Sequence, residues 1–314
     1  MTATTQPPAL SPALNGVARL THLGVIRIEG DDAAKFIHGQ LTQDFSLLDQ
    51  HTARLAAFCN AKGRMQASFV GFKRPDGTIL LICSRDMLAG TLKRLSMFVM
   101  RAKAKLTDAT DNFAVYGLAG DAIKSIAGHA HSTWAKAEFD TQSVVNLYPA
   151  DGVARQLCVA PSEALIPEGA ILDLALWQWS EVRSGVATLT QPVFEAFVPQ
   201  MLNYESVGGV NFKKGCYPGQ EVVARSQFRG TLKRRTFLAH CKAAMQSGDE
   251  VFSVAEPEQP AGSVVQAAQA PAGGWDALIS LQLSAVEAGA LAHQSASGPA
   301  IELLALPYPL LEDI

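Results

Sequence analysis

The spacing of apolar residues changes after residue 235, and this change constrains the fold of the 314-residue chain more than any other feature. Before it, strand-like runs are interspersed with segments of helical spacing. After it, only short strand-like runs remain, separated by Gly, Pro and Ser, at 236–241, 251–254, 263–268, 277–283 and 301–304. Such runs are typical of sandwiches and barrels. We therefore expect residues 236–314 to form a small β barrel or sandwich, with 256–274 as a loose hairpin loop.

The preceding residues are predicted to form two α+β domains, 18–110 and 111–235. In the first, we expect strands at 25–29, 52–58, 65–72 and 78–84, a helix that starts near Asp31 and ends at Gly39, and a helix at 86–98. In the second, we expect strands at 113–118, 144–147 and 156–160 and helices at 121–127 and 171–183. A long connection punctuated by Pro and Gly follows, and binding loops tend to occur in such segments. Residues 1–17 are predicted to be a flexible leader.

Composition limits the cellular setting. The formal net charge of -3 gives no general reason for binding nucleic acid or membranes, and no apolar run approaches the roughly 20 residues of a spanning helix. Five scattered cysteines without a C-x-x-C pair favour a reducing compartment and argue against a disulfide framework or a zinc site. The first fifteen residues contain no Lys or Arg, which fits neither a secretory signal nor a transit peptide. We expect a cytoplasmic protein that binds no membrane.

Residues 213–229 contain the most unusual chemistry of the chain. Gly215 and Gly219 flank Cys216, which predicts a sharp turn that presents the thiol, followed by a helix at 220–227. Lys213 or Lys214, the positive end of that helix and Arg225 would all favour the thiolate. Cys216 is thus a candidate nucleophile, redox thiol or cluster ligand. The alternative is a small apolar side chain that fills a tight turn.

Two kinds of cysteine chemistry are disfavoured. None of the seven histidines lies in a stretch that indicates a catalytic partner, which argues against a cysteine hydrolase. No spacing supplies the other ligands of a complete iron–sulfur cluster, so a cluster that touches this chain would be transient or shared.

Positive charge is concentrated between residues 213 and 235, which contain seven basic residues and one acidic residue, Glu221. This local excess favours an anionic ligand or partner. Two alternatives remain open: a solvated basic face, or a docking surface for RNA or protein.

The segment 214–221, K-G-C-Y-P-G-Q-E, closely resembles the signature K-G-C-[FY]-x-G-Q-E of the YgfZ family of folate-binding proteins. Four further segments are similar to sequence motifs of that family: 36–44 (F-I-H-G-Q-L-T-Q-D), 61–64 (A-K-G-R), 181–185 (E-V-R-S-G) and 199–203 (P-Q-M-L-N). The resemblance covers about residues 18–310.

This resemblance implies a fold like that of the glycine cleavage T-protein, an aminomethyltransferase that uses tetrahydrofolate. Two interleaved α+β domains and a C-terminal β barrel would then surround a central cavity that holds the folate. The family is implicated in keeping iron–sulfur enzymes active, including enzymes that modify tRNA. The implied partners are iron–sulfur enzymes or assembly proteins, with Cys216 as the functional thiol at the mouth of the cavity and Lys214 as the charge that tunes it.

The resemblance also implies a set of folate-binding residues. Glu181 would accept hydrogen bonds from the pterin, and Arg183 or Arg225 would attract the anionic glutamate tail. The remaining residues that we expect at the folate are Asn203, Gln220, Glu221, Lys62 and Arg64. Purely structural roles remain open as alternatives. Glu181 could be a helix-end carboxylate that pairs with Arg183 or with Lys and Arg elsewhere. Glu221 could stabilise its own helix, Gln220 could hydrogen-bond a loop, and Lys62 and Arg64 could be solvated charges at a hairpin tip.

One departure from the T-protein bears on catalysis. The T-protein has a motif with paired Asp residues that supplies an acid group next to the folate. The corresponding strand here, 65–70, reads M-Q-A-S-F-V and carries no carboxylate. Pro218 also replaces a hydroxyl residue of many family members. We therefore expect a folate-binding accessory factor for iron–sulfur cluster assembly or repair, with no nucleic acid as a direct ligand. The alternative is a tetrahydrofolate-dependent one-carbon transferase.

Overall fold

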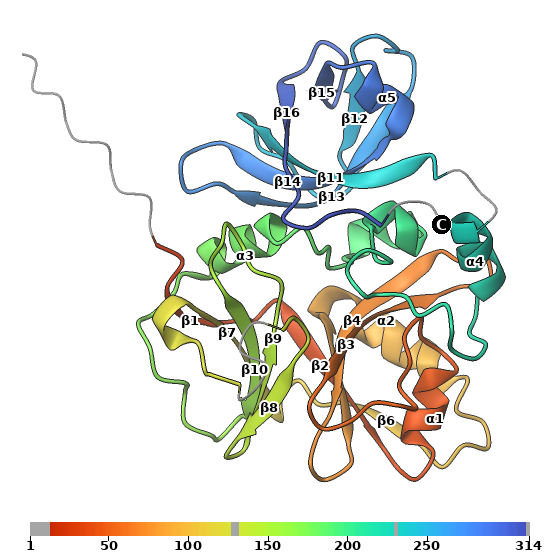
Figure 1. Cartoon of the computed structure of the whole chain (residues 1–314), viewed down its shortest axis with the longest axis vertical. Coiled ribbons are helices and arrows are strands. Elements are labelled where there is room, and N and C mark those ends of the chain that lie inside the picture. Colours follow the sequence, from red (N-terminus) through yellow and green to blue (C-terminus); the bar gives the residue numbers. More distant parts are fainter. Residues whose placement is uncertain (1–12, 127–131, 229–231, 312–314) are drawn as a thin grey trace, which may run out of the picture.

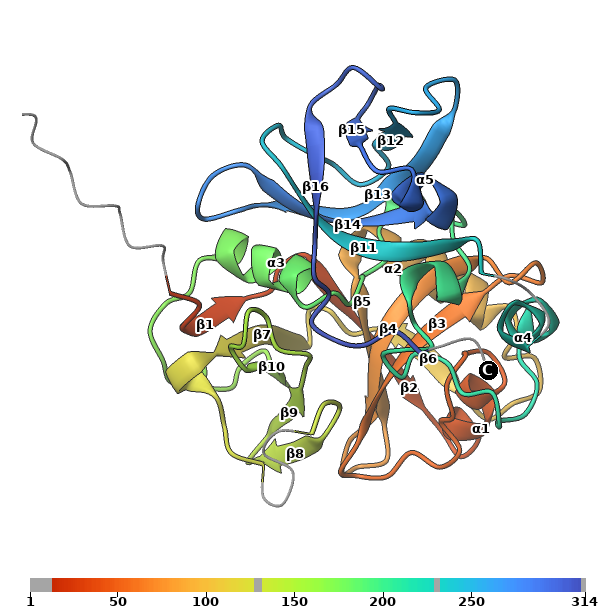
Figure 2. The same cartoon turned by 45° about the horizontal axis from the view of Figure 1, so that its top comes forward.

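The computed structural model describes residues 13–126, 132–228 and 232–311. Their strands form two five-stranded sheets and one closed barrel. Figure 1 shows the barrel at the top and the two sheets side by side below it, with helix α3 (Leu174–Arg183) between these layers. The turned view in Figure 2 shows the same arrangement. The predicted α+β fold with a C-terminal β barrel is confirmed.

The first sheet has the strand order β3-β4-β5-β2-β6, with antiparallel pairing throughout. Its strands are β2 (Leu23–Glu29), β3 (Ala53–Cys59), β4 (Met65–Lys73), β5 (Ile79–Ser84) and β6 (Lys105–Asp108). Helix α1 (Ala33–His38) ends just before Gly39, and α2 (Arg85–Ser96) packs against β2 and β6. Four of these strands and both helices occupy the positions predicted from apolar spacing.

The second sheet has the order β1-β7-β10-β9-β8. Its strands are β1 (Gly16–Arg19), β7 (Phe113–Ala119), β8 (Lys136–Phe139), β9 (Gln142–Asn146) and β10 (Arg155–Pro161). Strand β1 overlaps the expected leader and first domain, yet it pairs with β7 at the edge of this sheet. The chain therefore enters the second sheet first and returns to it later, which interleaves the two sheets. Residues 1–12 of the expected leader lie outside the described part.

The helix expected at 121–127 is wrong. The structure has only a short 3-10 helix, η1 (Gly120–Ala122), and the chain then continues in an extended form at Ile123. The side-chain amide of Gln156 both donates to the Lys124 carbonyl oxygen and accepts from the Lys124 backbone N–H. These two bonds hold residue 124 as a neighbouring strand would, so its backbone groups are not available to a helix.

A long connection leads from α3 to the barrel. It contains two short 3-10 helices, η2 (Gln191–Val193) and η3 (Pro199–Leu202), and then helix α4 (Gln220–Phe228). The predicted helix at 220–227 is confirmed. Both figures place α4 near α1, at the side of the molecule away from α3.

The barrel has the strand order β11-β14-β13-β12-β15-β16. Its elements are β11 (Arg234–Cys241), β12 (Glu250–Ser253), β13 (Pro260–Gln269), β14 (Trp275–Gln282), β15 (Leu291–His293), β16 (Ala300–Leu304) and the short helix α5 (Leu283–Glu287). Strand β13 contains the strand predicted at 263–268, so the loose hairpin loop expected at 256–274 is wrong over most of its length. A Cβ added to Gly262 would come within 2.2 Å of the Ser280 carbonyl oxygen, so the small residues there allow close strand packing.

The largest core cluster joins the first sheet, α3, the connection and the barrel. It includes Leu55 of the first sheet, Val182 of α3, Tyr204 of the connection, Leu278 of the barrel and Tyr308 near the C-terminal end. Burial of these side chains against one another favours the packing of the barrel on α3 and the first sheet. This shared core surrounds the cavity described below.

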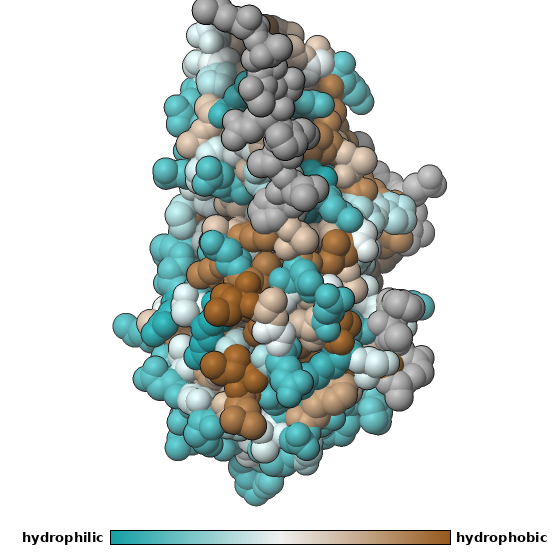
Figure 3. All heavy atoms as spheres, turned by 90° about the vertical axis from the view of Figure 1, so that its left-hand side faces the viewer, coloured by the Kyte–Doolittle hydropathy of each residue, from teal (hydrophilic) through white to brown (hydrophobic). Residues whose placement is uncertain are grey.

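The outer face beside β1 carries single apolar side chains. Leu165, Ile166 and Ile171 are exposed in the segment between β10 and α3. Figure 3 shows this face, where apolar residues form small patches among polar ones. No helix among the described residues is long and apolar enough to cross a membrane.

Candidate functional site

The segment 208–214, which leads to Cys216, is held against residues 38–44. The Thr42 hydroxyl donates to the Gly209 carbonyl oxygen at 2.6 Å, and the Asn211 backbone N–H donates to the Thr42 carbonyl oxygen at 2.9 Å. The Gln43 amide donates to the Gly208 carbonyl oxygen at 2.7 Å. The two segments, predicted separately from the sequence, are thus parts of one structure. We call residues 213–219 the cysteine loop.

Lys214 anchors the cysteine loop. Its side chain is only 8% exposed, and its ammonium donates to the carbonyl oxygens of His38 at 2.5 Å and Leu41 at 2.8 Å. The ammonium also lies 4.6 Å from the ring centroid of Tyr217. Burial lowers the pKa of Lys214 to about 8, although the charges of Asp44 and Cys216 act in the opposite direction. Lys214 is therefore both a structural anchor and a charge that interacts with the thiol.

Gly219 ends the loop in a tight contact. It has a φ of +81°, and an added Cβ would lie 2.4 Å from the Asn60 carbonyl oxygen and 2.7 Å from Gly63. The loop thus packs on the 60–64 turn of the first sheet, which the sequence identified as a separate motif. Gly215, by contrast, does not have a positive φ, so of the two glycines that flank Cys216 only Gly219 adopts the left-handed backbone conformation that favours glycine.

Cys216 is the exposed thiol of the chain. The other four cysteines, Cys59, Cys83, Cys158 and Cys241, are buried. Burial raises the pKa of Cys59 and of Cys83 to about 12. The interpretation of Cys216 as a residue packed inside a tight turn is therefore wrong.

A histidine lies beside the cysteine loop, and sequence reasoning did not identify it. A Cβ added to Gly215 would lie 3.4 Å from His38 Nε2, and His38 Nδ1 is 3.0 Å from a carboxylate oxygen of Asp44. Burial would raise the pKa of Asp44, but hydrogen bonds from Ser46 and Leu47 and the neighbouring His38 hold it below its usual value. Only the segment's resemblance to a family motif could have signalled this cluster.

An internal cavity lies between the two sheets and α3. Glu181, on the last turn of α3, accepts a hydrogen bond from Trp177 Nε1 at 3.0 Å, and its two oxygens lie 3.1 and 3.2 Å from His22 Nε2. Burial lowers the pKa of His22, but the hydrogen bond and charge of Glu181 outweigh this effect and raise the pKa overall. The alternative in which Glu181 pairs with Arg183 is wrong, because Arg183 pairs with Asp151 and Asp276.

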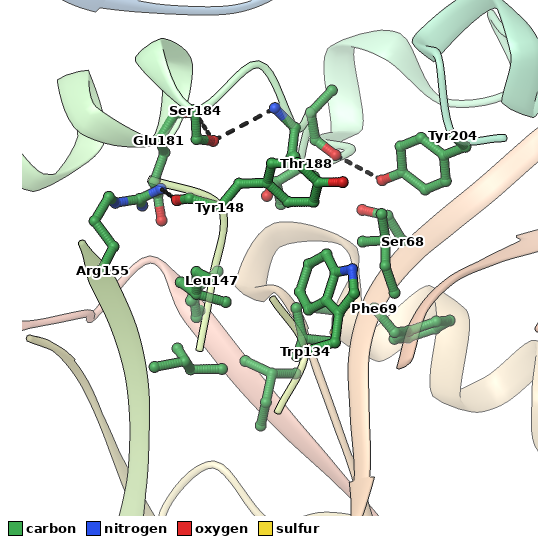
Figure 4. A pocket seen from close by; sticks show the side chains of 18 of the residues that line it. Ser68, Phe69, Trp134, Leu147, Tyr148, Arg155, Glu181, Ser184, Thr188 and Tyr204 are labelled. Atoms are coloured by element: carbon green, nitrogen blue, oxygen red, sulfur yellow. Dashed lines mark hydrogen bonds between the residues drawn. The ribbon is translucent and has the colours of Figure 1, made fainter. Parts of the chain in front are cut away.

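Aromatic rings and a buried arginine form much of the cavity wall. Trp134, Tyr148, Trp177 and Tyr204 line it (Figure 4). Arg155 of β10 also lines it, is 4% exposed, and has its guanidinium carbon 4.4 Å from the Trp177 ring centroid. Burial lowers the pKa of Arg155 to about 10, although the charge of Glu181 opposes this. The signal that could have identified Arg155 is a charged residue at the start of an apolar strand.

The cavity continues into an open groove. Its volume of about 70 Å³ is room for roughly two water molecules at their spacing in the liquid. Glu181 and Thr188 line both this cavity and a groove of about 670 Å³ that opens between α3 and the barrel, with Arg85 and Trp275 on its walls. The small inner cavity and the larger outer groove therefore meet at Glu181 and Thr188.

The other residues expected at a folate do not line this cavity or groove. Arg183 is held by its two ion pairs, and buried Asn203 donates to the Thr236 carbonyl oxygen of β11 at 2.8 Å. Arg64 donates to the Ala196 carbonyl oxygen, and Lys62 is exposed on the same turn. Gln220, Glu221 and Arg225 lie on α4. The structure thus brings Glu181 alone of this set to the cavity.

Cys216 likewise lines neither space, so its expected position at the cavity mouth is corrected. It lies on the loop before α4, whereas Glu181 lies on α3. The basic stretch is not one surface either: Arg235 is buried and pairs with Glu205 at 2.6 Å, and Lys214 is buried, while Lys213, Arg225 and Lys233 are exposed. Arg229 lies outside the described residues.

The fold and the cavity define a protein with the aminomethyltransferase fold. Aminomethyltransferase T of the glycine cleavage system from Bartonella henselae superposes with a TM-score of 0.63 and 14% identity, over 95% of this chain and 86% of that chain. At this identity the likeness concerns the fold alone. The tRNA-modifying protein YgfZ of Aliivibrio fischeri (strain MJ11) is 29% identical over 265 residues, which cover 80% of each chain. The resemblance to the YgfZ family predicted from the motifs is therefore confirmed, although no family model matches the chain.

Proposed function

We propose that this protein is a tetrahydrofolate-binding accessory factor for iron–sulfur cluster assembly or repair that acts through Cys216. The observation that carries the proposal is a single exposed thiol on a loop fixed by buried Lys214, in a molecule that also contains a carboxylate-bearing aromatic cavity. The similarity to a tRNA-modifying protein supports it.

The residues of the cavity fit the pterin head of tetrahydrofolate. The amide and amino groups of a pterin donate hydrogen bonds that the Glu181 carboxylate can accept, and the aromatic rings can pack on its faces. The inner cavity of about 70 Å³ is smaller than the roughly 150 Å³ that holds one benzene ring, so it would admit the edge of the pterin that carries these groups, with the rest of the head in the outer groove. The aminobenzoate and glutamate parts would then extend past Glu181 and Thr188 into the outer groove.

Cys216 would act on a partner and not on the folate, because it does not line the cavity. No three His, Cys, Asp or Glu side chains gather to hold a metal ion within residues 13–126, 132–228 and 232–311. A cluster that Cys216 contacts would therefore take its other ligands from an iron–sulfur enzyme or assembly protein. In this view the thiol serves as one exchangeable ligand or redox group.

The alternative, a one-carbon transferase, has less support. Glu181 is the only carboxylate among the described residues that line the cavity, and strand β4 contributes Ser68 where an acid would be needed. The Glu181 oxygens already accept from Trp177 and lie close to His22. Measurable turnover of a one-carbon donor with tetrahydrofolate would nevertheless favour this alternative.

Two experiments test the proposal. Titration of the purified protein with tetrahydrofolate should show saturable binding that Glu181→Ala weakens by at least about tenfold, while Glu29→Ala on the outside of β2 should leave it unchanged. In a strain that lacks its own factor, Cys216→Ala should fold and bind folate but fail to restore iron–sulfur enzyme activity. Cys241→Ala, which removes a buried thiol of the barrel, serves as the control. Full complementation by Cys216→Ala would contradict the proposal.

A further inference from the structure

Arg155 is the second charged group in the cavity, and the proposed function leaves it unexplained. It forms no ion pair with the described residues, and its Nε has no hydrogen-bond partner among them. Its one protein hydrogen bond runs from Nη1 to the Tyr148 carbonyl oxygen at 3.3 Å. Burial of a guanidinium with unused hydrogen-bond donors costs free energy. An acceptor on a bound ligand would offset this cost.

The position of Arg155 relative to Glu181 suggests which acceptor this is. Figure 4 shows the guanidinium reaching from β10 toward the Glu181 carboxylate, and the two groups interact electrostatically without forming an ion pair. A donor-only group therefore lies beside an acceptor-only group on one wall of an aromatic cavity. This pair is complementary to a heterocycle whose edge carries adjacent N–H donors and a carbonyl acceptor.

A pterin has such an edge, with an amino group, a ring N–H and a carbonyl oxygen in sequence. We infer that Arg155 is a specificity-determining residue that donates to the pterin carbonyl oxygen while Glu181 accepts from the adjacent N–H groups. This inference rests on the proposed folate binding and goes beyond it, because it predicts which pterins are admitted. An analogue with an amino group in place of the carbonyl would place a donor against the Arg155 donors.

The two residues predict opposite preferences, which makes the inference testable. Glu181 alone would bind the diamino analogue at least as well as the pterin, because the extra amino group makes the ring more basic and favours pairing with a carboxylate. Arg155 would reverse this preference, because it would leave buried donors unpaired and repel a protonated ring. The sign of the preference therefore reports on Arg155.

The test measures the affinities of tetrahydrofolate and tetrahydroaminopterin, which differ at this one substituent, by calorimetric titration. The full-length protein should bind tetrahydrofolate at least about tenfold more tightly, and Arg155→Met should lose this preference or reverse it. Arg27→Met, on the outer surface of β2, should keep it. A thermal melt of each variant checks that it is folded.

The outcomes are distinct. If the unsubstituted protein binds both compounds equally or prefers the diamino form, the inference is overturned while folate binding stands, and this comparison does not depend on any variant folding. If folded Arg155→Met keeps the preference, Arg155 does not contact the carbonyl and the inference is also overturned. If the unsubstituted protein binds neither compound, the proposed folate binding fails and the inference fails with it.

Discussion

The Lys214 ammonium donates a hydrogen bond to the main-chain carbonyl oxygen of His38, a residue 176 positions earlier in the chain. A second bond reaches the Leu41 carbonyl oxygen. Lys214 therefore does more than place a positive charge near Cys216. It joins the cysteine loop to the end of α1, and the position of the thiol depends on this connection.

Replacement of Lys214 should both destabilise the protein and change how its stability depends on pH. Lys214→Met leaves two buried carbonyl oxygens without their donor, which should cost about 1–3 kcal/mol in free energy of unfolding. The folded pKa of about 8 lies below the usual lysine pKa of 10.5, so the unfolded chain binds this proton more tightly. Between these values, Lys214 makes stability rise with pH, and the variant should lack this rise. Urea denaturation at several pH values measures it, with exposed Lys213→Met as the control.

Gly219 should be far less tolerant of substitution than a glycine of similar backbone conformation in open space. Gly219→Ala would place its Cβ against Asn60 and Gly63, whereas Gly77, with a φ of +87°, has no atoms within 4 Å of that position. Gly77→Ala should cost only the left-handed penalty of roughly 1–2 kcal/mol. Gly219→Ala should cost about 1–3 kcal/mol more because of the close contact. Equal changes in the midpoints of thermal unfolding would contradict this account.

One thiol of five should react quickly in the native protein. Cys216 is exposed, while the other cysteines are buried and burial raises the pKa of Cys158 to about 11. A chromogenic disulfide reagent should therefore modify one thiol rapidly and the remaining four only after unfolding. Cys216→Ser should remove the rapid phase without a large loss of stability. A rapid phase that persists in this variant would show that another cysteine is accessible.

The His22–Glu181 pair should contribute more to the free energy of unfolding in mild acid than near neutral pH. Glu181 raises the pKa of His22 above its unfolded value, so the pair stabilises the fold fully below that value, and the contribution disappears as pH rises through the folded pKa. Glu181→Gln should flatten this part of the curve of unfolding free energy against pH. The other titrating groups are common to both proteins, so the difference between their curves isolates the pair. An unchanged slope would argue against the coupling.

Local patterns were sufficient to predict most elements. Apolar alternation located β4 and β14, helical spacing located α2, and glycine and proline spacing separated the short strands of the barrel. These features depend on neighbours within a few residues, which a sequence shows directly. The missed elements, such as β1 and β15, are only four and three residues long, too short for a clear period.

The sequence by itself determined the α+β and barrel segments and the exposed turn of Cys216, and it identified Glu181 and Lys214 as candidate site residues. Only the tertiary structure decided that Lys214 is buried at α1, that Arg183 and Asn203 are committed to other partners, and that Arg155 enters the cavity beside Glu181. The physical reason is that burial and side-chain pairing are set by contacts between distant segments. Residue type and spacing along one segment do not specify which distant partner will use a side chain's hydrogen-bonding capacity.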